Sequence, residues 1–185
     1  MATAISHAVA ALAIAACFYS REVPKRVWAL GAVYAALPDL DVIGFAFGIP
    51  YDSVWGHRGI SHAIAFAFAL ATLTVALRYR RGVPGLSALG LGAFLFLATI
   101  SHGLLDALTD GGLGVAFFAP FDNGRYFFPV TPIKVSPIGL RPFFTARGLS
   151  VMRNEMVWIW APSVAVAGLA LALRRSCLPG QRPGA

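Results

Sequence analysis

Four histidines and three aspartates of this sequence fall at the ends of apolar segments, and imidazole with carboxylate is a metal-binding combination. The most informative stretch is Ser101-His102-Gly103-Leu104-Leu105-Asp106, which ends a long apolar run from Pro84 to Leu105. On a helix, residues four apart lie on one face with Cβ atoms ~5–6 Å apart, so His102 and Asp106 can hold one ion between them. A hydrogen bond between the two side chains inside a helix bundle would explain this pair, taken alone, equally well.

The composition is that of a membrane protein. Of the 185 residues, 58% are hydrophobic and only 12% are charged, with a mean hydropathy of +0.71. A single soluble domain does not need so much apolar sequence, so lipid is the expected solvent for much of the surface. The net charge of +7 comes from short basic clusters between apolar runs, which are typical of membrane topology determinants and not of a nucleic-acid-binding face. No nucleic acid partner is therefore expected.

The two cysteines, Cys17 and Cys177, lie at opposite ends of the chain without a CxxC partner, so neither a zinc knuckle nor a disulfide framework is expected. The stretch from Ile14 to Cys17 resembles a lipoprotein cleavage box. However, residues 1–7 contain no Lys or Arg, and a signal peptide needs a positive n-region. The first apolar segment is therefore expected to be retained.

Apolar runs separated by basic or Pro/Gly-rich loops predict an all-α integral membrane bundle of about five apolar helices. The expected helices cover residues 4–19, 27–37, 62–77, 84–105 and 158–173. The second run meets Pro38-Asp39-Leu40-Asp41, and its short length predicts a broken or half-inserted helix that is buried in protein or lines a polar cavity. Ser61 is the expected N-cap of the third helix.

Residues 109–150 differ in character, because glycines, prolines and aromatics replace helical periodicity there. Irregular stretches of this length inside a domain are often functional, so this segment is expected to form a lid with short helical or interfacial pieces. Residues 1–175 are expected to form a single membrane-embedded domain. The Pro/Gly-rich tail, residues 176–185, is expected to be disordered.

The basic residues give the expected topology in the membrane. The positive-inside rule places three short loops on the cytoplasmic side. These loops contain Arg21, Lys25 and Arg26; Arg78, Arg80 and Arg81; and Arg174 with Arg175. Alternating helices then bring the other four helix ends together on the opposite side, although basic residues of the lid on that side weaken the charge asymmetry. Those four ends carry His7, Asp39, Asp41, His57, His62, His102 and Asp106.

A cluster of imidazoles and carboxylates without thiolates suits Zn²⁺, and also Mn²⁺ or Fe²⁺. Seven candidate ligands exceed the needs of one tetrahedral ion, which favours two or more ions that share carboxylates. Two ions about 3.5–4 Å apart are suited to phosphoester hydrolysis, because they act on the attacking water and on the leaving oxygen. His57 and His62 are five apart with Gly59 between them, so they cannot share a helical face, and either one can be the ligand.

Two arginines are candidate anion ligands. Arg58 and Arg125 lie near the proposed ligands, and a guanidinium group binds phosphate oxygens bidentately. Both are equally well explained as interfacial anchors that reach lipid head groups. Three further aspartates, Asp52, Asp110 and Asp122, are as easily explained as turn residues.

Five segments, in this order, resemble the YdjM-type family of inner-membrane, metal-dependent hydrolases. They are His7, Leu37-Pro38-Asp39-Leu40-Asp41, His57-Arg58-Gly59-Ile60-Ser61-His62, the stretch from Ser101 to Asp106, and Pro120-Phe121 with Arg125. The resemblance covers roughly residues 5–140. That family is thought to be distantly similar to zinc-dependent phospholipase C and P1-type nucleases, which are all-α proteins with a multinuclear zinc site.

The resemblance implies a bacterial inner-membrane protein, whose metal site would then face the periplasm, and it implies phosphoester hydrolysis and a set of site residues. The implied ligands are His7, Asp39, His62, His102 and Asp106, with Asp41 as ligand or base and His57 as a further candidate. The soluble relatives have two more histidines and a glutamate after the HxxxD helix, whereas this sequence has no histidine after His102. Two ions, most simply Zn²⁺, are therefore expected in place of three.

The leading hypothesis from the sequence is a membrane-embedded hydrolase that cleaves a phosphoester of a lipid or lipid-linked substrate with metal-activated water. Its catalytic residues would be Asp41, Arg58 and Arg125. The alternatives are a metal transporter and a scaffold or regulator with a structural metal. A transporter needs a route through the membrane, and only Glu22 is acidic near the cytoplasmic ends. A structural site would be closed to exchangeable water.

Overall fold

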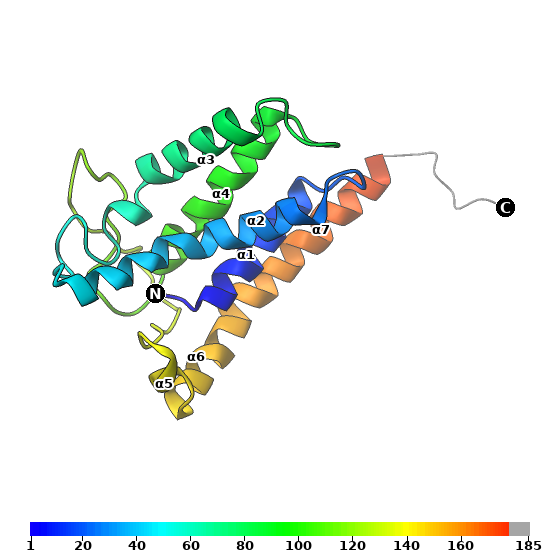
Figure 1. Ribbon diagram of the computed structural model, residues 1–185. Coiled ribbons are helices and arrows are strands. Elements are labelled where there is room, and N and C mark those ends of the chain that lie inside the picture. The colour runs from blue at the N-terminus through cyan, green and yellow to red at the C-terminus, as the bar shows by residue number, and fades with distance from the viewer. Residues whose placement is uncertain (178–185) are drawn as a thin grey trace.

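The computed structural model describes residues 1–177, and all regular structure in this part of the chain is helical (Figure 1). The elements are α1 (Ala4–Cys17), α2 (Lys25–Ala36), η1 (Leu37–Phe47), η2 (Ile60–His62), α3 (Ile64–Arg78), α4 (Ala88–Ala107), α5 (Leu140–Phe143), α6 (Ala146–Glu155), η3 (Met156–Trp160) and α7 (Ala161–Cys177). Elements η1 and η2 are 3-10 helices, and η3 is a π-helix. The expected all-α class is confirmed.

Three helical stretches are long and apolar enough to cross a membrane: Lys25–Phe47, Ala88–Ala107 and Ala146–Ser176. The apolar helices Ala4–Cys17 and Ile64–Arg78 are shorter. Large apolar side chains such as Leu77 and Leu89 are 76% and 84% exposed on the outside of the bundle, as expected where lipid replaces water. The five apolar segments expected from the sequence are therefore all helical.

The expected break in the second helix is wrong. Helix α2 continues directly into η1, and together they form one stretch of 23 residues. Pro38 lies in the first turn of η1, at the point where the chain changes from α to 3-10 geometry. A proline inside a helix lacks the N–H for an α-helical bond, and the tighter 3-10 turns accommodate it without ending the helix. The polar residues after Pro38 are therefore carried on a helix and not on an open loop.

Helix α4 packs against α1, α2 and α3, and α7 lies along α1 (Figure 1). Phe94 of α4 fills the centre of the largest buried apolar cluster and contacts Trp28 edge-on, with ring centroids 5.5 Å apart. Gly31 of α2 is required there, since a Cβ atom at this position would lie 2.1 Å from Phe94 Cζ. This close approach brings α2, and with it η1, against the helix that ends in His102 and Asp106.

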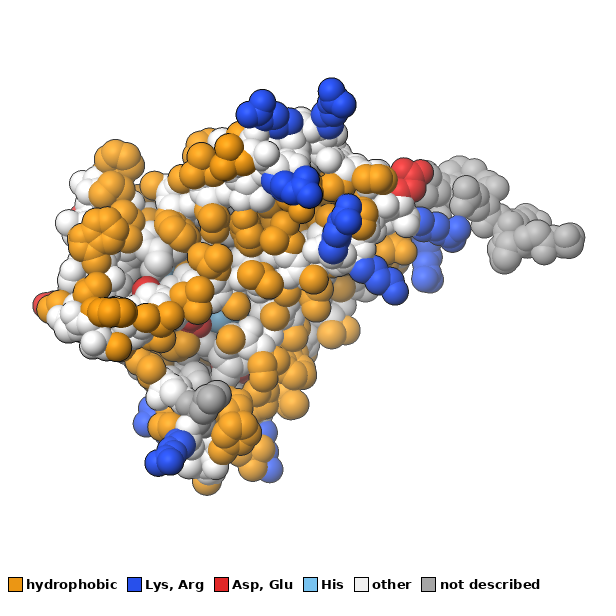
Figure 2. Space-filling view, viewed as in Figure 1, with side chains coloured by type: hydrophobic (Ala, Val, Ile, Leu, Met, Phe, Trp, Pro, Cys, Tyr) orange, Lys and Arg blue, Asp and Glu red, His pale blue; other side chains and the backbone are white. Residues whose placement is uncertain are grey.

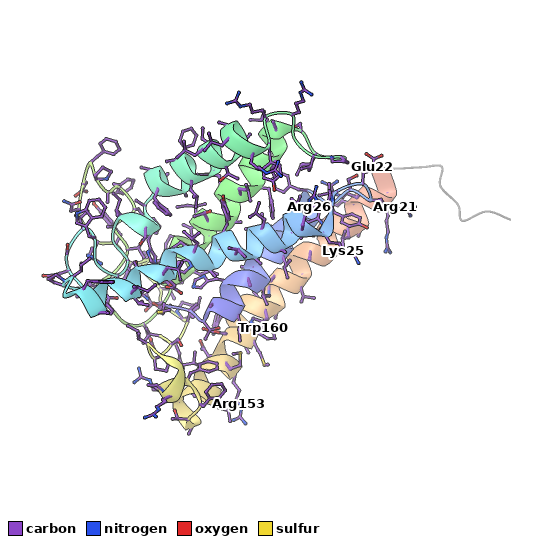
Figure 3. The ribbon with its side chains drawn as sticks, in the orientation of Figure 1. Arg21, Glu22, Lys25, Arg26, Arg153 and Trp160 are labelled. Carbon is purple, nitrogen blue, oxygen red and sulfur yellow. The ribbon has the colours of Figure 1, made fainter. Side chains whose placement is uncertain are left out.

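The basic loops meet at one end of the bundle, as the sequence predicted. Arg174 near the end of α7 donates hydrogen bonds to the carbonyl oxygens of Cys17 at the end of α1 and of Tyr19 in the α1–α2 loop. Gly85 of the α3–α4 loop lies beside Ser20 and Glu22 of the same loop. Figure 3 shows the labelled residues of the α1–α2 loop at this end, and Figure 2 shows Lys and Arg side chains gathered there.

The region expected to be a lid is irregular only in its first part. Residues 109–139 contain turns and isolated β-bridges, and α5 and α6 follow. The last apolar helix is longer than expected, because α6, η3 and α7 run on from one another, starting at Ala146 and not at Trp158. Of the expected disordered tail, residues 176 and 177 belong to α7, and residues 178–185 lie outside the described part of the chain.

Candidate metal centre

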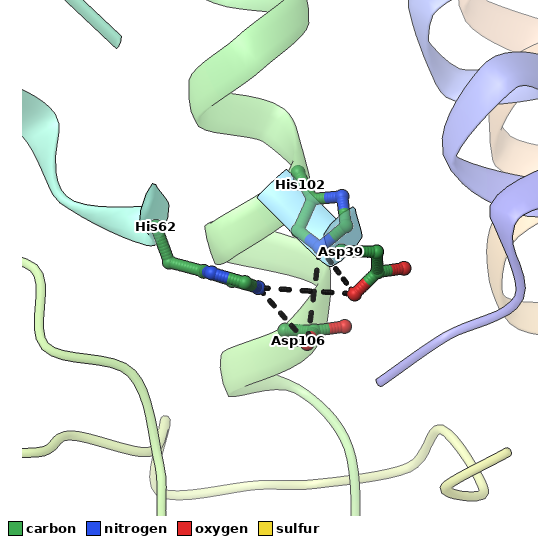
Figure 4. A group of neighbouring side chains, drawn as sticks. All are labelled: Asp39, His62, His102 and Asp106. Carbon is green, nitrogen blue, oxygen red and sulfur yellow. Dashed lines mark ion pairs between the residues drawn. The ribbon is translucent and has the colours of Figure 1, made fainter. Parts of the chain in front are cut away.

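Three elements bring four predicted ligands together at the end of the bundle opposite the basic loops. Asp39 comes from η1, His62 from η2, and His102 and Asp106 from the last turns of α4 (Figure 4). One ligand atom from each of these four side chains lies within 4.8 Å of all the others. All four residues are buried. The predicted meeting of these helix ends is therefore confirmed.

The distances inside this group fit one metal ion. His102 Nε2 lies 3.2 Å from Asp39 Oδ1 and 4.0 Å from Asp106 Oδ2. His62 Nε2 lies 3.9 Å from Asp39 Oδ1 and 3.8 Å from Asp106 Oδ2. Ligand atoms around a tetrahedral zinc are roughly 3.3–3.5 Å apart, since each bond is ~2.0–2.1 Å long. Small side-chain movements would close the group around an ion.

The strongest indication of a ligand is a set of buried polar atoms that have no hydrogen-bond partner among residues 1–177. Buried polar groups are nearly always hydrogen-bonded, so such a concentration calls for an explanation. A divalent cation explains it, because these atoms converge and nearly all of them belong to the predicted ligands. They are both ring nitrogens of His7, both carboxylate oxygens of Asp39, His62 Nε2, His102 Nε2, Asp106 Oδ2 and Arg58 Nε.

The ring of His102 is oriented as in a metal ligand. Its Nδ1 lies 2.6 Å from the carbonyl oxygen of Ala35, which can only accept a hydrogen bond. The proton of a neutral ring therefore sits on Nδ1, and Nε2 turns its lone pair toward Asp39 and Asp106. A metal-bound histidine usually donates a hydrogen bond from its other ring nitrogen to a carbonyl or carboxylate oxygen, which fixes the orientation of the ring.

Asp41 organises a second, overlapping group with His57 and His62. Asp41 Oδ1 lies 2.6 Å from His57 Nδ1, and Asp41 Oδ2 lies 3.2 Å from His62 Nδ1. The same Oδ2 accepts hydrogen bonds from Ser61 Oγ at 2.6 Å and from the backbone N–H of Arg58 at 3.1 Å. Asp41 therefore orients both histidines, and either it supports the first group or it holds a second ion with His57.

His62 belongs to both groups, whereas His57 belongs to the second group with Asp41. His62 is therefore the ligand candidate for the four-residue group. Burial lowers the pKa of His62 to about 4, so its ring is neutral at pH 7, the form that binds a metal.

Ser61 contacts the site through its hydroxyl, since Ser61 Oγ lies 2.9 Å from His62 Nδ1. The expected capping role of Ser61 is wrong, because the N-cap of α3 is Ala63. The hydroxyl is used at the site, a role that its place between two candidate ligands could have signalled.

His7 lies beside the four-residue group. Its ring stacks on that of His102, with centroids 3.6 Å apart and planes 12° apart, and its Nε2 lies 3.4 Å from Asp106 Oδ1. The backbone N–H of Ala2 donates to the same Oδ1 at 2.8 Å. The start of α1 thus contacts the centre directly.

Arg58 is fully buried against Asp106. Its Nε lies 3.0 Å from Asp106 Oδ2, while its terminal nitrogens donate to Gly111 O and Thr109 Oγ1, each at 2.8 Å. Its backbone has a φ of 63°, a left-handed conformation that is uncommon outside glycine. The interfacial anchor that the sequence left open is excluded for Arg58, because an anchor would reach lipid head groups from the surface.

Arg125 stabilises the loop that carries His57 by hydrogen bonds. Its terminal nitrogens donate to the carbonyl oxygens of His57 at 3.0 Å, Tyr51 at 2.9 Å and Ser53 at 3.0 Å. These contacts occupy both terminal nitrogens, and a role in anion binding stays a prediction. Of the three aspartates that the sequence left open, Asp122 is a turn residue, because it accepts from Gly124 N two residues on at 2.7 Å. Asp110 instead accepts from Val135 N at 2.7 Å, a contact between two distant parts of the irregular segment.

Glu155 is a buried carboxylate that the sequence did not single out. It ends α6, has no exposed surface, and accepts hydrogen bonds from Thr3 and Ser6 at the start of α1. The available signal was an acidic residue directly before a long apolar segment, where an unpaired charge is unfavourable.

The fold and the site define a class: an all-α membrane protein with a buried His/Asp cluster able to hold metal ions at one end of its helices. The chain belongs to the YdjM inner membrane protein family, whose model matches residues 1–176. It is 38% identical over 175 residues to the inner membrane protein YbcI of Escherichia coli (strain K12), covering 95% of this chain and 100% of that relative. No solved structure matches the chain.

Proposed function

We propose that this protein is a membrane-embedded, metal-dependent hydrolase of the phospholipase C type that cleaves a phosphoester of a lipid or lipid-linked substrate. The observation that carries the proposal is the cluster of buried nitrogen and oxygen atoms of His7, Asp39, His62, His102 and Asp106 that lack a hydrogen-bond partner within the described residues. These residues would hold the metal, with two Zn²⁺ ions as the simplest occupancy and Mn²⁺ or Fe²⁺ as alternatives. Bound ions would polarise the phosphoryl oxygens and make water acidic enough to react at neutral pH.

The remaining polar residues have roles that follow from their contacts. The His57–Asp41 pair, 2.6 Å apart, is suited to accept and return a proton, because the carboxylate fixes the orientation of the ring. Arg58 is placed to balance negative charge at Asp106 and at a phosphoryl group beside it. Arg125 would hold the loop of His57 in place.

A lipid is the proposed substrate class because of the surroundings of the centre. Figure 2 shows acidic and histidine atoms at the bottom of a hollow whose surface is otherwise largely hydrophobic. Exposed aromatic side chains occur in the segments on this side, including Phe47 and Phe121, which are 79% and 89% exposed. A substrate with a polar phosphate and apolar chains matches such a surface, because each part meets its preferred surroundings.

A structural metal site is the second candidate, and burial is the observation that favours it. His7, His102 and Asp106 have no exposed surface, as in sites closed to exchangeable water. Activity on a substrate distinguishes the two candidates, whereas metal binding alone does not.

The proposal is tested in two steps on detergent-purified protein. Elemental analysis should give close to two Zn²⁺ or Mn²⁺ per chain, and His102→Ala/Asp106→Ala should lose them. The metal-loaded protein is then incubated with phosphatidylglycerol and with a polyprenyl phosphate, and the products are followed by ³¹P NMR. Metal-dependent cleavage that a chelator abolishes and added Zn²⁺ restores is expected. Bound metal without any turnover would favour the structural site, and absence of metal would refute both candidates.

A further inference from the structure

The carboxylate of Glu155 has no role in the proposed reaction, yet it is completely buried. Within residues 1–177, no Lys, Arg or His side chain forms an ion pair with it. A buried carboxylate without a cation is unfavourable unless hydrogen bonds satisfy it. Its partners therefore show what the residue is for.

All partners of Glu155 lie in the first turn of α1. Oε1 accepts from the backbone N–H of Thr3 at 2.7 Å, and Oε2 accepts from the hydroxyls of Thr3 and Ser6 at 2.6 Å each. Thr3 is the N-cap of α1, where unpaired N–H groups and the helix dipole favour a negative charge. The last membrane segment thus holds the first one through this charge.

A local change of helix type completes the arrangement. The π-helix η3 begins directly after Glu155, and Trp160 at its end donates from Nε1 to Ser6 Oγ at 2.8 Å. A π-helix has a wider turn than an α-helix, so residues five apart come closer to one face. Glu155 and Trp160 can therefore both reach Ser6. Figure 3 labels Trp160 on the segment beside the start of α1.

The two residues that bond Glu155, Thr3 and Ser6, are the direct sequence neighbours of two residues that contact the metal centre. Ala2 donates to Asp106 on one side of Thr3, and His7 follows Ser6 directly and stacks on His102. The backbone N–H of His7 also donates to Thr3 O at 3.1 Å. A shift or rotation of this first turn would move the His7 ring away from Asp106, since no hydrogen bond from residues 1–177 holds the ring itself.

We propose that Glu155 is a positioning residue for the metal centre: it fixes the first turn of α1 so that His7 faces Asp106 and can bind the metal. The inference rests on the proposed function, since it takes His7 as a ligand. It adds a residue from the last membrane segment, outside the segments that carry the predicted ligands.

The test is a double-mutant cycle on the affinity of the full-length protein for Zn²⁺, measured by competition with a chromophoric chelator. Glu155→Gln is expected to weaken binding by about 10–100-fold, the usual effect of losing the support of a ligand. His7→Ala removes the ligand itself and is expected to weaken binding at least as much. The combined variant should bind within about twofold of His7→Ala, because Glu155 acts through His7. Glu22→Gln is the matched control, since Glu22 is the other glutamate and is exposed at the opposite end.

Three results would overturn the inference. The first is an unchanged Zn²⁺ affinity in Glu155→Gln. The second is that Glu155→Gln weakens Zn²⁺ binding by the same factor in the wild type and in His7→Ala. If Glu155→Gln does not fold by circular dichroism, Ser6→Ala takes its place in the cycle, and unchanged affinity there is the third. Failure of the wild type to bind Zn²⁺ is a different result, which removes the metal centre itself and this role with it.

Discussion

Asp106 is the residue at which the charges of the centre meet. Its Oδ2 faces Arg58, His62 and His102, while its Oδ1 faces His7 and the backbone of Ala2. Without an ion, Arg58 is the permanent side-chain cation beside this carboxylate. With an ion, the same oxygen would be shared between guanidinium and metal. Arg58 therefore stabilises the fold most strongly when the metal is absent.

A prediction about Arg58 follows from this competition. Arg58→Ala should lower the free energy of unfolding of metal-free protein by about 3–5 kcal/mol, because it leaves a buried carboxylate unpaired. Saturating Zn²⁺ should reduce this difference. Chemical denaturation in detergent with and without a chelator provides the measurement. Arg26→Ala, an exposed arginine of the basic end, should change stability by less than about 0.5 kcal/mol. Equal losses in both variants would contradict the prediction.

Ser61 gives a second prediction at the same scale. Its hydroxyl contacts both Asp41 and His62, so Ser61→Ala should cost about 1 kcal/mol in stability and weaken Zn²⁺ binding about tenfold. The control is Ser176→Ala, because Ser176 is exposed at the far end of α7 and its hydroxyl donates to Ala172 O of the same helix. Zinc titration of both variants measures their Zn²⁺ affinities. Equal affinities in Ser61→Ala and Ser176→Ala would show that the Ser61 hydroxyl is not needed for metal binding.

At the scale of elements, the sequence predicted where the helices meet but not how each one is built. Apolar runs and the basic loops between them located the five apolar helices, because insertion into a membrane determines both patterns. Local geometry was predicted less well, because it depends on partners distant in sequence. Pro38 does not end its helix, and Ser61 bonds Asp41 across 20 residues. Glu155 could not be assigned from its neighbours, since its partners lie 149 and 152 residues away.

The contact between α2 and α4 gives a prediction for an element. Gly31→Ala would place Cβ 2.1 Å from Phe94 Cζ, so the two helices must separate or the ring must move. We expect a loss of about 1–3 kcal/mol in unfolding free energy, the usual cost of overpacking a core. Gly168→Ala in α7 is the matched control, because nothing lies within 4 Å of its Cβ position, and alanine there should stabilise by about 0.5–1 kcal/mol. Thermal unfolding of both variants gives the comparison.

At the scale of the whole molecule, the bundle has two chemically different ends. At one end the basic loops contact one another. Arg174 donates to Tyr19 O, and Gly85 lies beside the α1–α2 loop. The other end carries all four histidines, which are buried, together with the irregular residues 109–139. The positive-inside rule favours a cytoplasmic basic end, and the metal centre would then face the periplasm. Basic residues of α6 oppose this asymmetry, since Arg153 lies on the same side as the centre (Figure 3).

The orientation is tested by labelling single cysteines in intact cells of a bacterium that makes the protein. The background replaces Cys17 and Cys177 by serine, and two exposed reporters are added in turn: Phe121→Cys near the metal centre and Arg81→Cys in a basic loop. A membrane-impermeant maleimide should label the first and not the second, and both should react after the membranes are disrupted. The reverse pattern would place the centre in the cytoplasm. Its metal would then come from the cytoplasmic pool, and its lipid substrate from the inner leaflet.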